Sequence, residues 1–142
     1  MDYCNIDIEN CQISGSGQIQ ENSGGIAGNA FGRNSVCTIK NCSNSIGVAG
    51  DYSGGICGSA AGHGGTLTIT EYLDGNSSTA CENSGDITGK ECGGICGPGV
   101  GYNSGTVTIS NCTNNGEIGV DNGGICGPYA SHMGGNVLIS YW

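Results

Sequence analysis

Basic residues are scarce in this chain: three of its 142 residues are Lys or Arg, twelve are Asp or Glu, and the formal net charge is −9. Three cations cannot form the patch that binds a phosphate backbone or an anionic lipid surface, so we expect no nucleic-acid partner. No apolar run approaches the roughly 18 residues of a membrane span. The chain also opens without the basic and apolar regions of a signal peptide. From these absences we predict that the chain neither binds nucleic acid nor inserts into a membrane.

Large apolar side chains are also few, because Ile, Leu, Val and Phe together supply 25 residues. Combined with this net charge, such a composition is ordinarily typical of disordered chains. No segment shows a helical periodicity, and strong helix formers are rare. Glycine is abundant, with 30 copies. An internal repeat, which a disordered chain would not keep in register, outweighs the composition in deciding the fold class.

The tripeptide Gly-Gly-Ile recurs four times with spacings of 30, 39 and 30 residues. An alternating string that ends in Asn-Cys, such as 107–112, marks the same register. An insertion at about 72–80 accounts for the longer spacing. We predict one domain over 1–142, and its repeats are placed at about 5–35, 36–65, 66–105 and 106–135, with a partial repeat at 136–142.

Each repeat contains three short segments that can form strands. The first alternates apolar and polar residues, as in 107–110; the second is centred on residues such as Val48 and Ile87; the third is the Gly-Gly-Ile segment. Three strands per turn of about 30 residues predict an all-β, parallel β-solenoid with four turns and the leading strand of a fifth, because stacked turns bury a continuous apolar face. A β-sandwich fits less well, since equivalent residues recur once per repeat without a reversal of pattern.

Stacked turns would place equivalent residues in columns along the solenoid axis. One inner column of the first strand contains Ile8, Ile39, Ile69, Ile109 and Ile139. An inner column of the third segment contains Ile26, Ile56, Ile95 and Ile125. A polar column at the first corner contains Asn10, Asn41 and Asn111, whose side chains we expect to hydrogen-bond along the axis.

Seven of the ten cysteines fall into two further columns. One contains Cys11, Cys42, Cys81 and Cys112, and the other contains Cys57, Cys96 and Cys126. These columns fit buried thiols or disulfides. Ala27 takes the equivalent place in the first repeat, which favours a packing role. The segment 92–96, with a cysteine at each end, is a poor zinc site because no Cys-x-x-Cys pair and no nearby His accompany it. Cys4 and Cys92, outside the columns, are predicted to be the reactive thiols.

Two sets of residues are candidates for binding. An acid precedes each Gly-Gly-Ile, and a stacked row of these acids would be either a solvated edge or a weak calcium site: Glu21, Asp51, Glu91 and Asp121. Exposed tyrosines can stack on sugars, and an insertion in a regular scaffold is a common place for function, which gives the candidates Tyr102, Tyr129, Tyr72 and Asp74.

Catalytic motifs are not found in the sequence. It contains no Ser-His-Asp spacing, phosphate-binding loop or nucleotide fingerprint, so we expect neither a catalytic site nor a cofactor. A body of four turns is roughly 20 Å long and offers little room for a cleft. We therefore predict that the chain is not an enzyme.

The strings 54–58 (GGICG), 102–107 (YNSGTV) and 111–116 (NCTNNG) resemble GLUG-type repeats. Such glycine-rich units occur in large bacterial surface and secreted proteins, including adhesin-like ones. The resemblance implies an extracellular or cell-surface β-solenoid with a structural or adhesive role. The alternative is a carbohydrate- or protein-binding module that uses the loop face and the insertion. Because end strands present unpaired backbone groups, we expect end-to-end self-association or further repeats in a longer chain.

Overall fold

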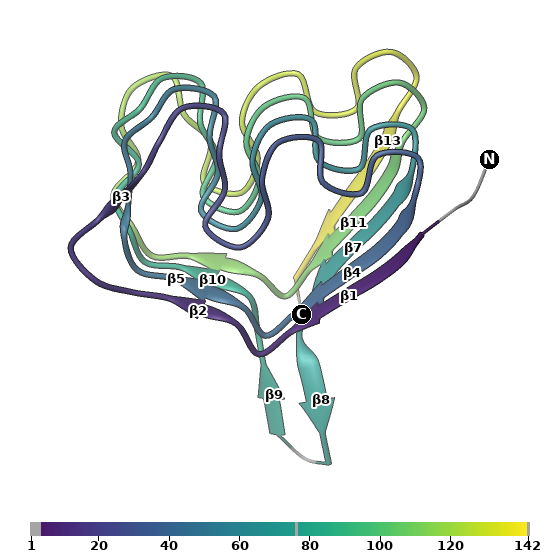
Figure 1. The fold of residues 1–142 in the computed structure, drawn as a ribbon, viewed down its shortest axis with the longest axis horizontal. Helices are drawn as coiled ribbons and strands as arrows, with labels where there is room; N and C mark the ends of the chain where they lie inside the picture. The colour runs from purple at the N-terminus through teal and green to yellow at the C-terminus, as the bar shows by residue number, and fades with distance from the viewer. Residues whose placement is uncertain (1–3, 76, 142) are drawn as a thin grey trace.

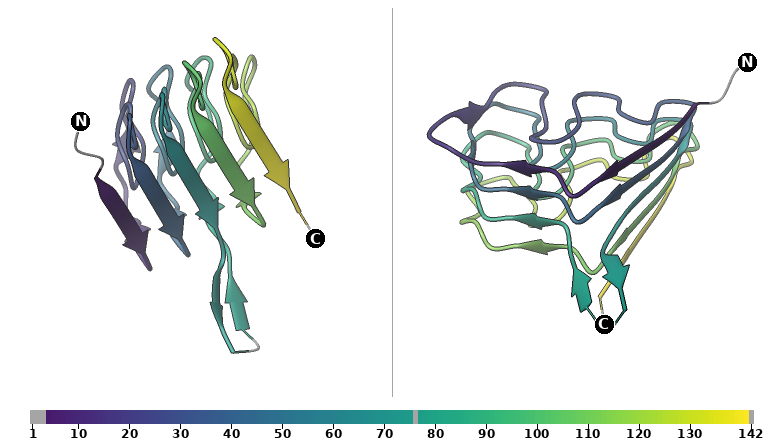
Figure 2. Two further views of the ribbon diagram at one scale, coloured as in Figure 1. Left: turned by 90° about the vertical axis from the view of Figure 1, so that its right-hand side faces the viewer. Right: turned by 60° about the horizontal axis from the view of Figure 1, so that its bottom comes forward.

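The computed structural model describes residues 4–75 and 77–141, and it shows the predicted parallel β-solenoid of about four turns of about 31 residues. One strand from each turn contributes to the largest sheet, in which neighbouring strands are parallel and in register. The order in this sheet follows the chain: β1 (Asn5–Glu9), β4 (Val36–Lys40), β7 (Thr66–Thr70), β11 (Thr106–Ser110) and β13 (Asn136–Ser140). Figure 2 shows these strands stacked from the N-terminal to the C-terminal turn.

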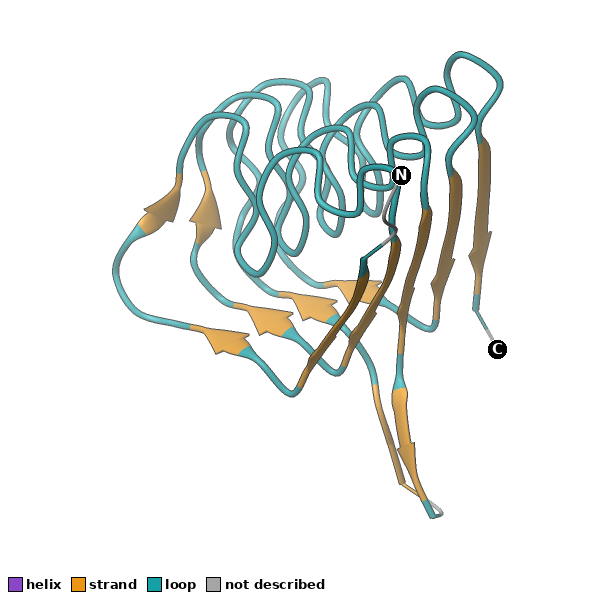
Figure 3. Ribbon diagram, turned by 45° about the vertical axis from the view of Figure 1, so that its right-hand side comes forward, coloured by secondary structure: helices purple, strands orange, loops and turns teal. Residues whose placement is uncertain are grey.

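Two smaller parallel sheets complete the turns (Figure 1). The second sheet consists of β2 (Gln12–Ile13), β5 (Ser43–Asn44), β10 (Glu82–Asn83) and β12 (Thr113–Asn114). The third contains β3 (Gln18–Ile19) and β6 (Gly47–Val48), and single bridges continue it through Ile87 to Ile118. Loops make up the rest of each turn (Figure 3). The described residues contain no helix, and so none that could cross a membrane.

The Gly-Gly-Ile segments are not the extended third strand that the sequence predicts. Each of the first three makes two isolated bridges to the next turn, one at its first glycine and one at the residue after Ile, as in Gly54–Gly93 and Cys57–Cys96. The second sheet, conversely, has no alternating pattern that would reveal it, because polar residues occupy both positions of strands such as β5. Backbone pairing between turns, rather than local strand propensity, creates both features.

The insertion at 72–80 forms a hairpin that leaves the stack of turns intact. β8 (Tyr72–Asp74) and β9 (Ser77–Thr79) pair antiparallel and project from the corner between the first two sheets (Figure 1). On either side of the hairpin, the Cys81 thiol donates to the Thr70 carbonyl oxygen at 3.4 Å. The Cys112 thiol makes the equivalent bond to Ser110 at 3.3 Å in the next turn, where no insertion intervenes. The solenoid therefore continues across the insertion in the predicted register.

Columns of apolar residues fill the interior, as predicted. Ile39 pairs with Ile69 and Ile69 pairs with Ile109, and each of these side chains is at most 1% exposed. Backbone N–H groups join the second column from turn to turn, over Ile26, Ile56, Ile95 and Ile125. Burial decreases in the last strand, where Ile139 is 49% exposed. Each turn thus relies on its neighbours to bury its apolar face.

Both cysteine columns are present, and all ten cysteines are free thiols. Within the column of Cys42 and Cys81, the thiol of Cys42 donates to the Lys40 carbonyl oxygen at 3.2 Å. A hydrogen bond with Cys112 is the largest of the effects that raise the pKa of Cys81 to about 12. Thiols in this environment stay protonated at neutral pH, so they act as small packing groups.

The predicted asparagine column at the first corner forms two hydrogen-bonded pairs. Asn10, Asn41 and Asn111 have left-handed φ angles of 58°, 48° and 54°, which asparagine tolerates better than most residues. Asn41 Nδ2 donates to Asn10 Oδ1 at 2.7 Å. Glu71 takes this place in the third turn, and its carboxylate accepts a hydrogen bond from Asn111 Nδ2 at 2.8 Å.

A second asparagine ladder lies inside the solenoid, and the sequence analysis did not identify it. Asn44 Nδ2 donates to Asn83 Oδ1 at 2.7 Å, and Asn83 Nδ2 donates to Asn114 Oδ1 at 2.6 Å. Each Nδ2 also donates to the carbonyl oxygen two residues ahead, as Asn83 does to Gly85 at 2.8 Å. Asn44 and Asn83 are at most 1% exposed, so their amides have exchanged water for partners in adjacent turns.

The buried ladder explains the second glycine of Gly-Gly-Ile. A Cβ atom on Gly55 would lie 2.5 Å from Asn83 Oδ1 and would clash with the carbonyl oxygen of Gly94. A Cβ atom on Gly94 would lie 2.6 Å from Asn114 Oδ1. Only a residue without a side chain lets the backbone approach the ladder this closely.

We expect Asn83→Ala to lower the free energy of unfolding by about 2–4 kcal/mol, because it leaves the partners of a fully buried amide unsatisfied. Asn115→Ala is the matched control: Asn115 is exposed and donates to Glu82 Oε1 at 2.8 Å. The control should cost about 0.5 kcal/mol or less. Urea unfolding of both variants measures the difference, and equal losses would contradict a structural role for the inner ladder.

Candidate functional site

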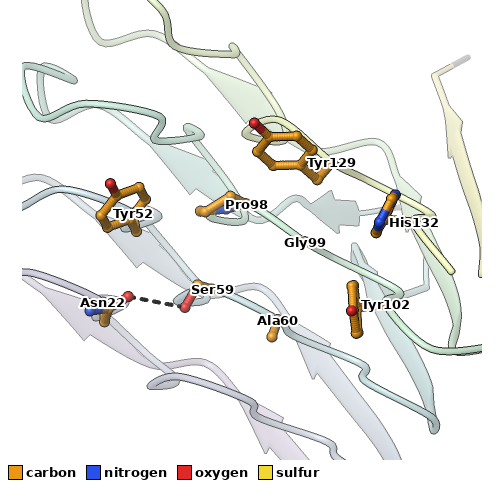
Figure 4. A pocket seen from close by; sticks show the side chains of 9 residues that line it. All are labelled: Asn22, Tyr52, Ser59, Ala60, Pro98, Gly99, Tyr102, Tyr129 and His132. Atoms are coloured by element: carbon orange, nitrogen blue, oxygen red, sulfur yellow. Dashed lines mark hydrogen bonds between the residues drawn. The ribbon is translucent and has the colours of Figure 1, made fainter.

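A groove of about 450 Å³ lies among the loops of the solenoid. Aromatic rings dominate its lining, and they belong to Tyr52, Tyr102, Tyr129 and His132. Figure 4 shows Pro98 between Tyr52 on one side and the other three rings on the opposite side. Since the lining residues come from four successive turns, the groove crosses the turns and follows the solenoid axis.

Polar groups occupy the end of the groove nearest the N-terminal turn. Ser59 Oγ donates to Asn22 Oδ1 at 3.5 Å, and both side chains line the groove (Figure 4). Along the groove, the backbone is already hydrogen-bonded between turns, because Ala60 N–H donates to the Pro98 carbonyl and Gly99 N–H to the Pro128 carbonyl. Recognition in this groove therefore depends on side chains.

Three rings form a stacked column beside and within the groove. The ring centroids of His63 and Tyr102 are 5.3 Å apart with the planes at 24°, and those of Tyr102 and His132 are 5.6 Å apart at 32°. Tyr129 meets His132 edge-on at 6.3 Å. These contacts lie in the range that is favourable for aromatic pairs, so the aromatic surface is formed before any ligand arrives.

Two of the groove tyrosines adopt a left-handed backbone conformation. Tyr52 has φ 58° and Tyr129 has φ 63°. A bulky residue is uncommon at positive φ, where glycine and asparagine are preferred. The equivalent of Tyr52 in the first turn is Asn22, and the equivalent of Tyr129 in the third turn is Gly99. The repeat imposes this conformation in every turn, whichever residue stands there, so it does not require a tyrosine at either place.

The structure brings together two of the four predicted binding residues. Tyr102 and Tyr129 both line the groove, but they are not equivalent, because Tyr102 is in the same column as His132. Tyr72 and Asp74 lie in β8, at the corner from which the hairpin projects (Figure 1). Tyr72 lines a separate, smaller hollow there.

Sequence reasoning missed His132, which also contributes a ring to the lining. A signal for the ring column exists in the sequence. Its three rings stand seven residues after the Ile of Gly-Gly-Ile, at His63, Tyr102 and His132, and the first turn has Arg33 at the same place. Aligning the loops on that Ile would have revealed the column.

The register of the turns shows that the four acids do not form the single stacked row that the sequence predicts. Glu21 and Asp51 stand three residues before their Gly-Gly-Ile, whereas Glu91 and Asp121 stand two residues before theirs. Lys90 is the equivalent of Asp51 in the next turn, and its N–H donates to Asp51 Oδ1 at 2.9 Å. The four acids thus belong to two columns. Within the described ranges, no cluster of three His, Cys, Asp or Glu side chains is arranged to hold a metal ion.

Cys92 is not the accessible thiol that its position outside the columns predicts. Its side chain is fully buried, and its thiol donates to the Gly50 carbonyl oxygen at 3.2 Å. Burial raises the pKa of Cys92, which lowers the thiolate fraction at neutral pH. Cys4 and Cys11 are the exposed cysteines.

Comparisons of this chain with protein-family models, with curated proteins and with solved structures find no match. What the structure establishes is the β-solenoid of about four turns, and functional inference depends on this fold and on the groove.

We expect the melting temperature in calcium-containing buffer to be unchanged by EDTA, because the candidate acids are divided between two columns. Differential scanning calorimetry with and without the chelator makes the measurement, and magnesium buffer serves as the control. A melting temperature that falls only when calcium is removed would restore the calcium interpretation.

We expect a thiol reagent at neutral pH to label Cys4 and Cys11 in the native protein and Cys92 only after unfolding. Peptide mapping after a labelling pulse identifies the sites. The intact mass under non-reducing conditions should show no loss of about 2 Da per cysteine pair. Labelling of Cys92 in the folded protein would contradict its buried placement.

Proposed function

We propose that this chain is a non-enzymatic structural and adhesive repeat segment of a surface-displayed or fibre-forming protein. The observation that carries the proposal is the in-register pairing of five equivalent strands from β1 to β13, which fixes every turn to its neighbours. A solenoid built in this way acts as a stiff spacer whose length grows with the number of turns. The resemblance to GLUG-type repeats supports an extracellular or cell-surface location.

The two outer strands of the first sheet support assembly by stacking. β1 and β13 each pair with one neighbour, so each has an edge that can accept another strand. Apolar side chains are exposed beside these edges: Ile6 is 38% exposed and Ile139 is 49% exposed. Further turns of the same kind, or a second copy of the chain, would cover both edges.

The aromatic groove favours a second candidate function. Rings and polar side chains converge there from four turns, which suits a module that binds a carbohydrate or a protein segment. The two functions are compatible, since the groove lies among the loops and leaves the strand edges free.

We expect the purified chain to associate as its concentration rises, and Ile139→Lys to shift this association to at least about tenfold higher concentration, because a charge on an edge strand opposes strand addition. Leu73→Lys is the control: Leu73 is 67% exposed on the hairpin, away from the edges. Sedimentation velocity and electron microscopy follow assembly. A wild-type chain that stays monomeric at high concentration would overturn assembly by stacking.

A further inference from the structure

We propose that the aromatic groove binds a neutral oligosaccharide that lies along the solenoid axis. This inference rests on the second candidate function, and it assigns the ligand class and the residues that hold it. Tyr52, Tyr102, Tyr129 and His132 supply ring faces, and Asn22 and Ser59 supply hydrogen-bonding groups.

The chemistry of the lining matches a sugar chain. A sugar ring has apolar C–H faces and a rim of hydroxyl groups, so it can pack on an aromatic face while its hydroxyls bind amide and hydroxyl side chains. Tyrosine and histidine offer both a ring face and a polar atom, and they dominate this groove. Since backbone groups along the groove are already bonded between turns, the groove has little to offer a peptide that binds by strand addition.

The charge of the chain indicates which class of sugar the groove can bind. The chain carries a net charge of −9, and its three basic residues, Arg33, Lys40 and Lys90, do not line the groove. An anionic glycan would meet repulsion and find no lysine or arginine in the groove to pair with. The ligand is therefore an uncharged glycan.

The layout of the groove calls for several sugar units. Asn22 belongs to the first turn and Tyr129 to the fourth, so the lining spans three steps between turns. Three steps of about 4.8 Å make roughly 14 Å. The neighbouring rings of Tyr102 and His132, tilted by 32°, follow the same direction, with their centroids 5.6 Å apart.

The repeat does not require the two tyrosines, which indicates that the groove is a site rather than a by-product of the repeat. Tyr52 and Tyr129 have φ angles of 58° and 63°, and the equivalent residues Asn22 and Ala60 adopt the same conformation with φ angles of 56° and 55°. The fold therefore needs no ring at either place. Rings that the fold does not need, gathered in one groove, point to ligand binding.

The equivalent turns also provide variants that should fold. Tyr52→Asn copies the first turn and Tyr129→Ala copies the second, so the double variant should fold as the wild type does. We expect it to bind neutral oligosaccharides at least about tenfold more weakly than the wild type. Tyr72→Ala, which removes a tyrosine outside the groove, is the matched control and should bind as the wild type does.

The experiment is isothermal titration with hexasaccharides of cellulose, mannan, xylan and chitin, and with oligogalacturonate as an anionic comparison. Binding of a neutral hexasaccharide that the double variant loses and Tyr72→Ala retains supports the proposal. Binding that Tyr72→Ala loses and the double variant retains would overturn the groove assignment and leave the binding module in place at the hairpin. If oligogalacturonate alone binds, the assignment of a neutral ligand is overturned. If none of these glycans binds, the glycan proposal is overturned and the proposed structural function remains intact.

Discussion

The structure depends on one constraint: polar groups that enter the interior must find their partners one turn away. The ladder of Asn44, Asn83 and Asn114 meets this constraint with amide-to-amide bonds of 2.7 and 2.6 Å. A shift of one residue between turns would leave these buried amides without partners, and buried polar groups without partners are costly. The ladder therefore fixes the register of the second, third and fourth turns, while the apolar columns supply most of the driving force for stacking.

The same constraint explains how a chain so rich in glycine and so poor in large apolar residues forms a core. The interior is narrow, and the columns of Ile39 and of Ile56 occupy it together with small thiols such as Cys57 and Cys96. Gly55 and Gly94 leave the space that the asparagine ladder needs. Composition alone suggests disorder because it counts apolar residues without their spacing, whereas regular spacing lets each turn bury the face of its neighbour.

The groove arises where the repeat changes its residues without changing its backbone. Positions that hold Asn22 or Ala60 in one turn hold Tyr52 or Tyr129 in another, at nearly the same φ angle. Rings are thereby gathered on one surface of a scaffold whose backbone is hydrogen-bonded between turns along the groove. A regular solenoid can in this way combine a structural role, which needs equal turns, with a binding surface, which needs unequal ones.

Sequence periodicity by itself determined the parallel solenoid, the number of turns, the place of the insertion and the columns of Ile, Cys and corner Asn, because in-register stacking repeats each residue type once per turn. The second sheet, the inner asparagine ladder and the burial of Cys92 were decided by the tertiary structure, although the spacing Cys-x-Asn at 42–44, 81–83 and 112–114 hinted at the ladder. Partners in adjacent turns create these features, and a single repeat does not contain them. The groove likewise needed the fold, since Tyr52 and Tyr129 are distant in the sequence and line one groove only because the turns stack.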